Sequence, residues 1–185
     1  MKNFSPLGEM SAGQRGVLLV FFILTLTSCK IKYGLKGQTI PIEAKTISVA
    51  TFKICSNNAG LMPPTEPQLL SQKLRDAVSS QTNLGLIKQN GDLRFEECCV
   101  TEYKNGPQSI GSGQGDPTRL NRLSVSITVN YVNSFDASKG FTEKVFTRYF
   151  DYDGNKTLSQ IENEALDQIN RQLIEDIFNA AFNNW

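Results

Sequence analysis

Cysteines are the residues with the most chemistry to offer in this 185-residue chain, and the first of the four follows an apolar segment. Val17 to Leu24 is an unbroken apolar run that begins just after Arg15, and small residues separate it from Cys29. This layout is typical of a secretory signal, and the run is far shorter than the ~20 residues that span a bilayer. The sequence therefore predicts export rather than a transmembrane anchor.

The end of this signal, Leu26-Thr27-Ser28-Cys29, resembles a bacterial lipobox. The resemblance implies cleavage before Cys29 and attachment of lipid, including palmitate, to its thiol and its new amino group. Two or more acyl chains hold a protein stably at a membrane, whereas one holds it only marginally. We therefore expect a signal peptide over residues 1–28, a lipid tether over 29–44 and a folded domain over 45–185. The alternative is an ordinary secreted protein in which Cys29 is unmodified.

Three further cysteines, Cys55, Cys98 and Cys99, leave at least one thiol unpaired within the exported chain. Cys98 and Cys99 are adjacent, so they point to opposite faces of a strand. We expect Cys99 to be a small core residue and Cys98 to be the possible partner of Cys55 in a disulfide. No Cys-x-x-Cys spacing occurs, which excludes a zinc knuckle and a thioredoxin-type pair.

Histidine is absent from the chain, which removes the commonest general base and the commonest metal ligand. No Gly-x-Ser-x-Gly motif occurs either, so we predict that the protein is not an enzyme. Asp151, Asp153, Asn155 and Glu162 match ligand positions of a calcium loop, but Lys156 replaces the glycine that the loop requires. We therefore expect an ordinary strand–turn–helix junction there, with no metal and no cofactor.

The hydrophobic pattern predicts an α+β domain in which two helices pack on one face of a mainly antiparallel four-stranded sheet. Residues 29–185 carry 17 basic and 17 acidic side chains, which argues against a nucleic-acid partner. Capping boxes predict helix starts at Thr65 (with Gln68) and Ser159 (with Glu162). The helices should run to about residues 80 and 179. Strands are expected at 46–52, 84–88 (an edge strand), 93–103, 122–132 and 143–151, and Asn90-Gly91 is a turn signal.

Alternation is clearest in the strand at 122–132, where every second residue is apolar. Leu123, Val125, Ile127, Val129 and Tyr131 should be buried. Ser124, Ser126 and Thr128 should lie on the opposite face, which we expect to be wet or to contact a polar partner.

Taken together, these segments resemble the LptE-type lipopolysaccharide-assembly lipoproteins. Besides the lipobox, the residues that carry the resemblance are Ile42–Val49, Gly91–Glu96, Asn121–Leu123, Phe146–Tyr149, Asp151–Asp153, Gln172–Asn179 and the terminal Trp185. The resemblance implies two helices against a four-stranded sheet. It also implies a place on the periplasmic side of the outer membrane, as a plug in the LptD β-barrel that helps the barrel assemble and helps lipopolysaccharide reach the outer leaflet. The Cys98-Cys99 pair and the glycine-rich loop at 104–120 depart from the family.

The implied partners are an LptD-type barrel, lipopolysaccharide and the membrane itself, and they suggest contact residues. Ser124, Ser126 and Thr128 are candidates for contact with a polar barrel lumen. Lipopolysaccharide phosphates require cations; Lys88, Lys104, Arg119 and Arg122 are the candidates, and we expect them to cluster near strand ends and the long loop. The alternative function is a lipid-tethered periplasmic module that binds a metal or a cell-wall ligand.

Overall fold

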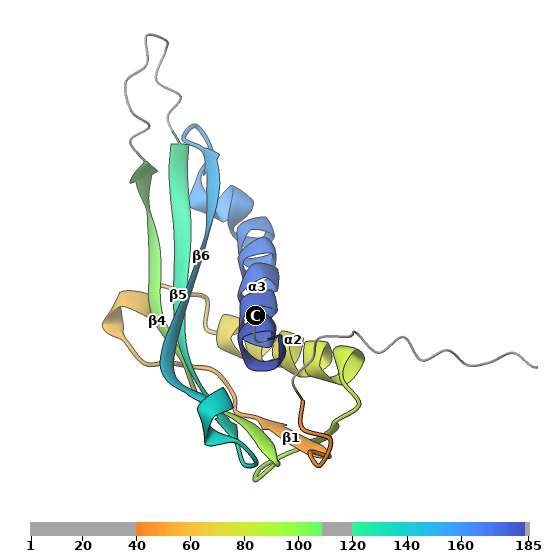
Figure 1. Cartoon of the computed structure of the whole chain (residues 1–185). Helices are drawn as coiled ribbons and strands as arrows, with labels where there is room; N and C mark the ends of the chain where they lie inside the picture. Colours follow the sequence, from red (N-terminus) through yellow and green to blue (C-terminus); the bar gives the residue numbers. More distant parts are fainter. Residues whose placement is uncertain (1–39, 109–119, 184–185) are drawn as a thin grey trace, which may run out of the picture. The chain divides into compact units, whose positions relative to one another are not determined.

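A mixed β-sheet carries two helices on one of its faces in the computed structural model, which describes residues 40–108 and 120–183 (Figure 1). The α+β class is confirmed. The predicted signal peptide, Cys29, the tether up to residue 39, Arg119 and Trp185 lie outside the described residues. The helices are α2 (Glu66–Gln81) and α3 (Leu158–Phe182), with short 3-10 helices η1 (Asn57–Ala59) and η2 (Ala137–Lys139). The strands are β1 (Thr46–Val49), β2 (Lys53–Ile54), β3 (Gly85–Ile87), β4 (Leu93–Gln108), β5 (Leu120–Asn133) and β6 (Phe141–Asp153).

The sheet corrects the prediction of four mainly antiparallel strands, because within the described residues it has six strands and mixed pairing. Its order is β3-β1-β4-β5-β6, and β2 continues beside β4 after β1 has ended. β1 runs parallel to both β3 and β4, whereas β4, β5 and β6 are antiparallel. The parallel pair follows from the helix: a strand–helix–strand crossover through α2 returns the chain in its original direction.

Residues 88–92 connect β3 to β4 across β1, so the Asn90-Gly91 turn does not close a hairpin between neighbouring strands. Asn90 takes a left-handed conformation with φ 58°. A Cβ on Gly91 would lie only 2.6 Å from the Ser48 nitrogen, which explains why glycine is needed where the connection passes so closely. Asp92 then fixes the start of β1, since its carboxylate accepts hydrogen bonds from the Lys45 and Thr46 nitrogens, each at 3.0 Å.

One face of β5 packs against α3, and this contact buries the apolar side of both elements. The apolar residues of β5 are buried: Leu123, Val125, Ile127, Val129 and Tyr131. So is the inner stripe of α3: Leu166, Ile169, Leu173, Ile177 and Ala181. Their burial supplies much of the hydrophobic free energy that holds the helix to the sheet. No helix of the described residues is both long and apolar enough to cross a membrane.

Both helix starts differ in detail from the prediction. α2 begins at Glu66 as expected, but the Thr65 side chain makes no capping hydrogen bond. α3 begins earlier than expected, because Thr157 is the residue before its first turn and its nitrogen donates to Gln160 Oε1 at 2.8 Å. Glu162 does not cap Ser159; it accepts a hydrogen bond from the Tyr103 hydroxyl and thereby ties α3 to β4.

Candidate functional site

The face of β4, β5 and β6 that points away from the helices is called here the outer face. Its residues follow from the register, because cross-strand partners point to the same side of a sheet. Thr147 lies opposite Ser126, Tyr149 opposite Ser124 and Val145 opposite Thr128. On the other flank of β5, Glu102 lies opposite Ser126 and Lys104 opposite Ser124. The three predicted barrel-contact residues are therefore together in the middle of this face.

Ser126 corrects the expectation of a wet strand face, because its exposed fraction is only 7%. Its hydroxyl lies 2.9 Å from the Thr147 hydroxyl and donates to Glu102 Oε2 at 3.2 Å. The side chains of Glu102 on β4 and Thr147 on β6 therefore cover Ser126 on the face that the helices leave open. The exposed large apolar side chains of the outer face are on β6, where Val145 is 62% exposed and Tyr149 is 50% exposed.

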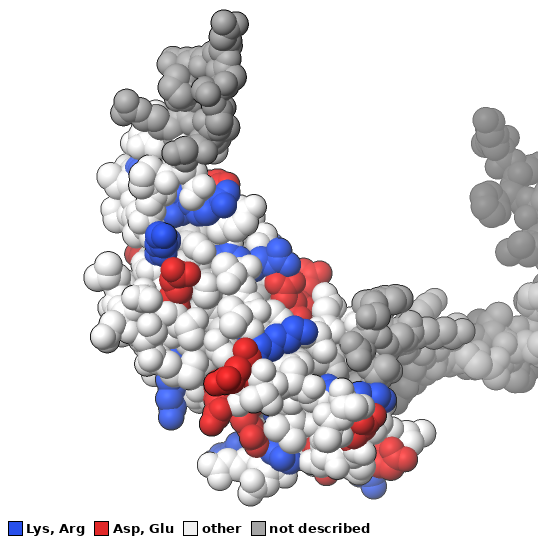
Figure 2. All heavy atoms as spheres, turned by 60° about the vertical axis from the view of Figure 1, so that its left-hand side comes forward, with Lys and Arg blue, Asp and Glu red and all other residues white. Residues whose placement is uncertain are grey.

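The cations predicted for lipopolysaccharide do not form a single cluster. Lys104 and Arg122 lie near one end of β4 and β5, and Lys88 follows β3 at the other end. At ~3.3 Å per residue along β4, the two groups are roughly 30 Å apart. Figure 2, in which the β4 side comes forward, shows blue and red side chains close together on a mostly white surface.

Arg122 is also occupied within the protein. Its guanidinium binds the Asp151 carboxylate through two hydrogen bonds of 2.6 and 2.7 Å, and it lies 3.6 Å from the centre of the Tyr149 ring. These hydrogen bonds lower the pKa of Asp151 below its ordinary value. The pair shields Arg122 from other anions and leaves Lys104 as the more available cation at this end of the sheet.

The acidic residues at the β6–α3 junction are likewise bound by protein groups. Asp151 holds Arg122, Asp153 accepts from the Asn155 nitrogen at 2.8 Å, and Glu162 accepts from Tyr103. Among the residues that the structure describes, no three His, Cys, Asp or Glu side chains are grouped as a metal site would require.

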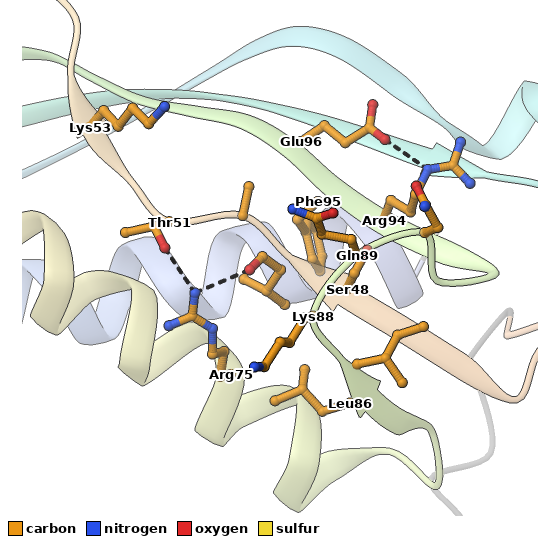
Figure 3. A pocket seen from close by; sticks show the side chains of 14 residues that line it. Ser48, Thr51, Lys53, Arg75, Leu86, Lys88, Gln89, Arg94, Phe95 and Glu96 are labelled. Atoms are coloured by element: carbon orange, nitrogen blue, oxygen red, sulfur yellow. Dashed lines mark hydrogen bonds and ion pairs between the residues drawn. The ribbon is translucent and has the colours of Figure 1, made fainter.

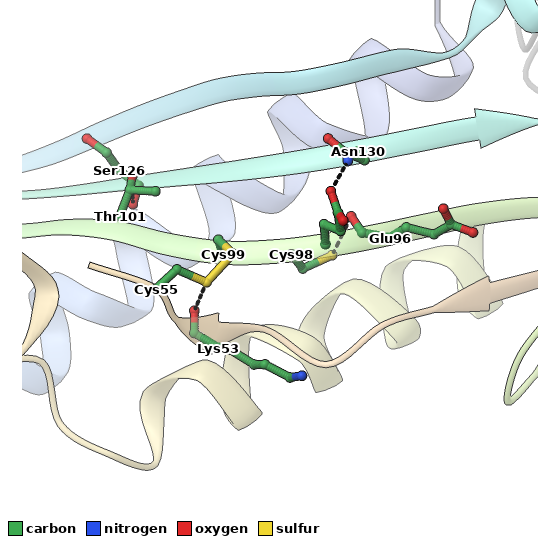
Figure 4. The surroundings of a disulfide bond; sticks show 9 residues. Lys53, Cys55, Glu96, Cys98, Cys99, Thr101, Ser126 and Asn130 are labelled. Atoms are coloured by element: carbon green, nitrogen blue, oxygen red, sulfur yellow. Dashed lines mark hydrogen bonds between the residues drawn. A yellow bond between two sulfur atoms is a disulfide. The ribbon is translucent and has the colours of Figure 1, made fainter. Parts of the chain in front are cut away.

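The disulfide joins Cys55 to Cys99, which makes the expected Cys55–Cys98 pairing wrong (Figure 4). The reason is a β-bulge in β4. The register between β4 and β5 shifts between Glu96 and Cys99, and Glu97 takes a left-handed φ of 47°. An extra residue in a strand reverses the alternation beyond it. Cys98 is consequently buried and free, whereas Cys99 lies on the outer face.

Burial determines the chemistry of the free thiol. The desolvation of Cys98 raises its pKa from 9.0 to about 12, which keeps it protonated and unreactive at neutral pH. The disulfide, in contrast, fixes the segment after β2 to β4, where the Cys55 nitrogen also donates to the Val100 oxygen at 3.0 Å. The burial of Cys98 and the pairing of Cys99 with Cys55 both depend on the bulge. The sequence contains no signal for a left-handed glutamate at position 97.

Comparison with known proteins finds a family match that spans almost the whole described domain. The family model LptE, described as lipopolysaccharide-assembly, matches residues 44–181. A search of curated proteins finds no match. A solved minor lipoprotein from Acinetobacter baumannii is 16% identical with a TM-score of 0.44, over 75% of this chain and 96% of that chain. The rare lipoprotein B from Shewanella oneidensis is 9% identical with a TM-score of 0.39, over 74% of this chain and 90% of that chain.

The match to the family model starts just before β1 and ends within the last turn of α3, so it includes every described strand and both helices. It covers more than half of the chain and confirms the resemblance noted from the sequence. This chain belongs to the LptE family of lipopolysaccharide-assembly proteins.

Proposed function

We propose that this protein is a non-catalytic outer-membrane lipoprotein that plugs an LptD-type β-barrel and assists its assembly. Lipid on Cys29 anchors the domain at the periplasmic side of the membrane, and the protein takes part in the transport of lipopolysaccharide to the outer leaflet. The observation that carries the proposal is the LptE family match over residues 44–181. The lipobox at Leu26–Cys29 supports the anchor.

The outer face suits contact with a barrel lumen, which is polar and presents alternating side chains. Its exposed side chains combine hydroxyl groups with limited apolar area, as in Thr147, Tyr149 and Val145. Ser124, Ser126 and Thr128 support these residues from β5, and we propose that β6 makes the first contact with the barrel wall.

Contact with lipopolysaccharide requires cations that face its phosphates. Neither Lys88 nor Lys104 forms an ion pair with any described residue, so we retain both as candidates. Arg122 is a weaker candidate because Asp151 neutralises it. Arg119 remains a candidate from the sequence alone.

Co-purification tests the proposal directly. The protein extracted from membranes in mild detergent should remain bound to a β-barrel of much larger mass. A photo-crosslinking residue at Val145 or Tyr149 should attach to that barrel, whereas the buried position 126 is unsuitable. Mass spectrometry should find a lipid-modified Cys29 at the mature N-terminus.

Two other outcomes of these experiments would contradict the proposal. A lipid-free protein that leaves the extract alone, with no crosslink from β6, would refute the plug. A lipid-modified protein without a barrel would favour the alternative, a tethered periplasmic module that binds a metal or a cell-wall ligand.

A further inference from the structure

A cleft of about 680 Å³ opens where the parallel strands β1 and β3 end (Figure 3). Its lining comes from the end of β1 and the residues after it (48–51), from the end of β3 and the residues after it (86–90), from the start of β4, from Lys53 on β2 and from Arg75 on α2. This cleft is remote from Lys104 and Arg122, and it lies at the opposite end of β4. The proposed barrel contact on β6 does not use it, and of the described lipopolysaccharide candidates Lys88 alone lines it.

Positive charge predominates in the cleft. Lys53, Arg75, Lys88 and Arg94 line it, and Glu96 is the one acidic side chain among its described lining residues. Glu96 is already bound, because Arg94 Nε donates to its Oε1 at 2.7 Å. Three of the four cations therefore lack a carboxylate partner among the described residues, and the cleft is complementary to an anion.

Arg75 is held in a defined position on this surface. Its Nη2 donates to the Val49 carbonyl oxygen at 3.2 Å and to Thr51 Oγ1 at 3.1 Å, so the guanidinium is fixed at the end of β1. Figure 3 shows the Lys88 side chain extending toward the side of the cleft where Arg75 lies. A guanidinium that is already oriented loses less entropy when it binds a carboxylate.

The neighbouring strand β3 has an open edge. Among the residues that the structure describes, its partner in the sheet is β1 alone, and the Gly85 nitrogen donates to the Lys45 oxygen at 2.8 Å. Because backbone groups alternate in direction along a strand, the N–H and C=O of Leu86 point away from β1. Leu86 and Ile87 are 41% and 39% exposed on opposite faces of this edge, and neither a proline nor a charged side chain protects the strand itself.

We infer that β3 and the cationic cleft together dock an extended acidic segment of a partner protein. The segment adds a strand beside β3, its backbone pairs with Leu86, and its carboxylates reach Arg75 and Lys88. Only a polypeptide satisfies both features, since the unpaired strand edge requires backbone donors and acceptors and the cleft requires anions. A phosphorylated lipid would meet the charges but would leave the edge unpaired.

A pair of peptide probes tests the charge requirement on the full protein purified in detergent. The first is a short fluorescent peptide that alternates valine and glutamate, and the second carries lysine in place of glutamate. Fluorescence anisotropy should show that the protein binds the acidic peptide and does not bind the lysine peptide. Lys88→Glu and Lys53→Glu should each weaken it about fivefold. Lys156→Glu makes the same charge change outside the cleft and should have no effect.

A proline substitution tests the strand pairing. Leu86→Pro removes the outward N–H, which an edge strand tolerates, and should abolish peptide binding while the thermal melt stays cooperative. Leu86→Val keeps the N–H and should retain binding. If Leu86→Pro does not fold, Lys88→Glu still decides the charge requirement. Normal peptide binding by either variant, once that variant is shown to be folded, overturns the inference.

Vesicles of phosphatidylglycerol provide the competing ligand. Binding of these vesicles that is lost in Lys88→Glu, without binding of the acidic peptide, would assign the cleft to a lipid phosphate and overturn the inference. The co-purification of a barrel is unaffected by either result, so failure of this inference and failure of the proposed function can be told apart.

Discussion

The two faces of β5 differ in what covers them and therefore in what they contribute. The apolar residues of one face are buried beneath α3, while the alternate residues of the other face are polar and have no helix above them. Ser126 nevertheless is almost as buried as the core, because Glu102 and Thr147 close over it. The comparison shows that burial alone does not identify a core residue. The chemistry of the neighbours decides whether a face stabilises the fold or presents a surface.

The largest expected effect comes from the covered face. Ile127→Ala removes a fully buried side chain and leaves a cavity, so it should lower the free energy of unfolding by about 2–5 kcal/mol. Urea denaturation followed by circular dichroism measures this. The adjacent Thr128→Ala changes the outer face and should cost less than about 1 kcal/mol. Equal losses in the two variants would contradict the division between the faces.

The hydrophobic periodicity predicts burial correctly where the local sequence pattern and the tertiary packing favour the same arrangement. The alternation in β5 and the apolar stripe of α3 both match the observed burial, because a long amphipathic element has one way to bury its apolar side. The LptE resemblance was also visible in the order of the segments. The alternation also assigns Ser124, Ser126 and Thr128 to the correct face of β5. The burial of Ser126 could not be predicted, because it depends on side chains from two other strands.

The parallel part of the sheet could not be predicted in the same way. β1 has four residues and β3 has three, and nothing in such short segments specifies which neighbour they pair with. The cysteines show the same limit, since the bulge at Glu97 alone decides which of the two adjacent thiols faces Cys55. The cationic cleft arises from residues 53, 75, 88 and 94, which only the fold brings together.

The disulfide gives the second largest expected effect. Cys55→Ser should lower the free energy of unfolding by about 2–4 kcal/mol, because the bond closes a loop across 44 positions of sequence. Thermal melts of the variant and of the oxidised wild type measure this difference. Cys98→Ala leaves the disulfide in place and serves as control. An unchanged melt of Cys55→Ser would show that the backbone pairing of β2 with β4 suffices.

Alkaline pH should lower the free energy of unfolding through Cys98. This thiol is on the covered side of β4, whereas Cys99 is on the outer face. Its pKa is raised to about 12, so folding favours the protonated thiol. The resulting stability is fully present below the unfolded value of 9.0 and is lost as pH rises toward 12. Between these values the slope should be up to about 1.4 kcal/mol per pH unit. Burial also raises the pKa of Tyr103 and Tyr131 above their ordinary value of 10.0, so these groups add to the loss of stability as pH rises above about 10.

Cys98→Ala isolates the contribution of the thiol. Denaturation midpoints of this variant and of the wild type, measured at pH 8 to 11, should converge as pH rises. Parallel profiles for the two proteins would mean that Cys98 titrates at its ordinary value and is accessible to water in the native state.

The smallest expected effect on stability is at Val145, and this position separates folding from function most sharply. Val145→Asp places a charge on an exposed position of β6, so the free energy of unfolding should change by less than about 0.5 kcal/mol. If β6 contacts the barrel, the same charge must be desolvated in the complex, and co-purification of the barrel should be strongly reduced. Lys156→Asp, an exposed change on the turn before α3, should leave the complex intact. A folded Val145→Asp variant that retains the barrel would show that a surface other than β6 makes the contact.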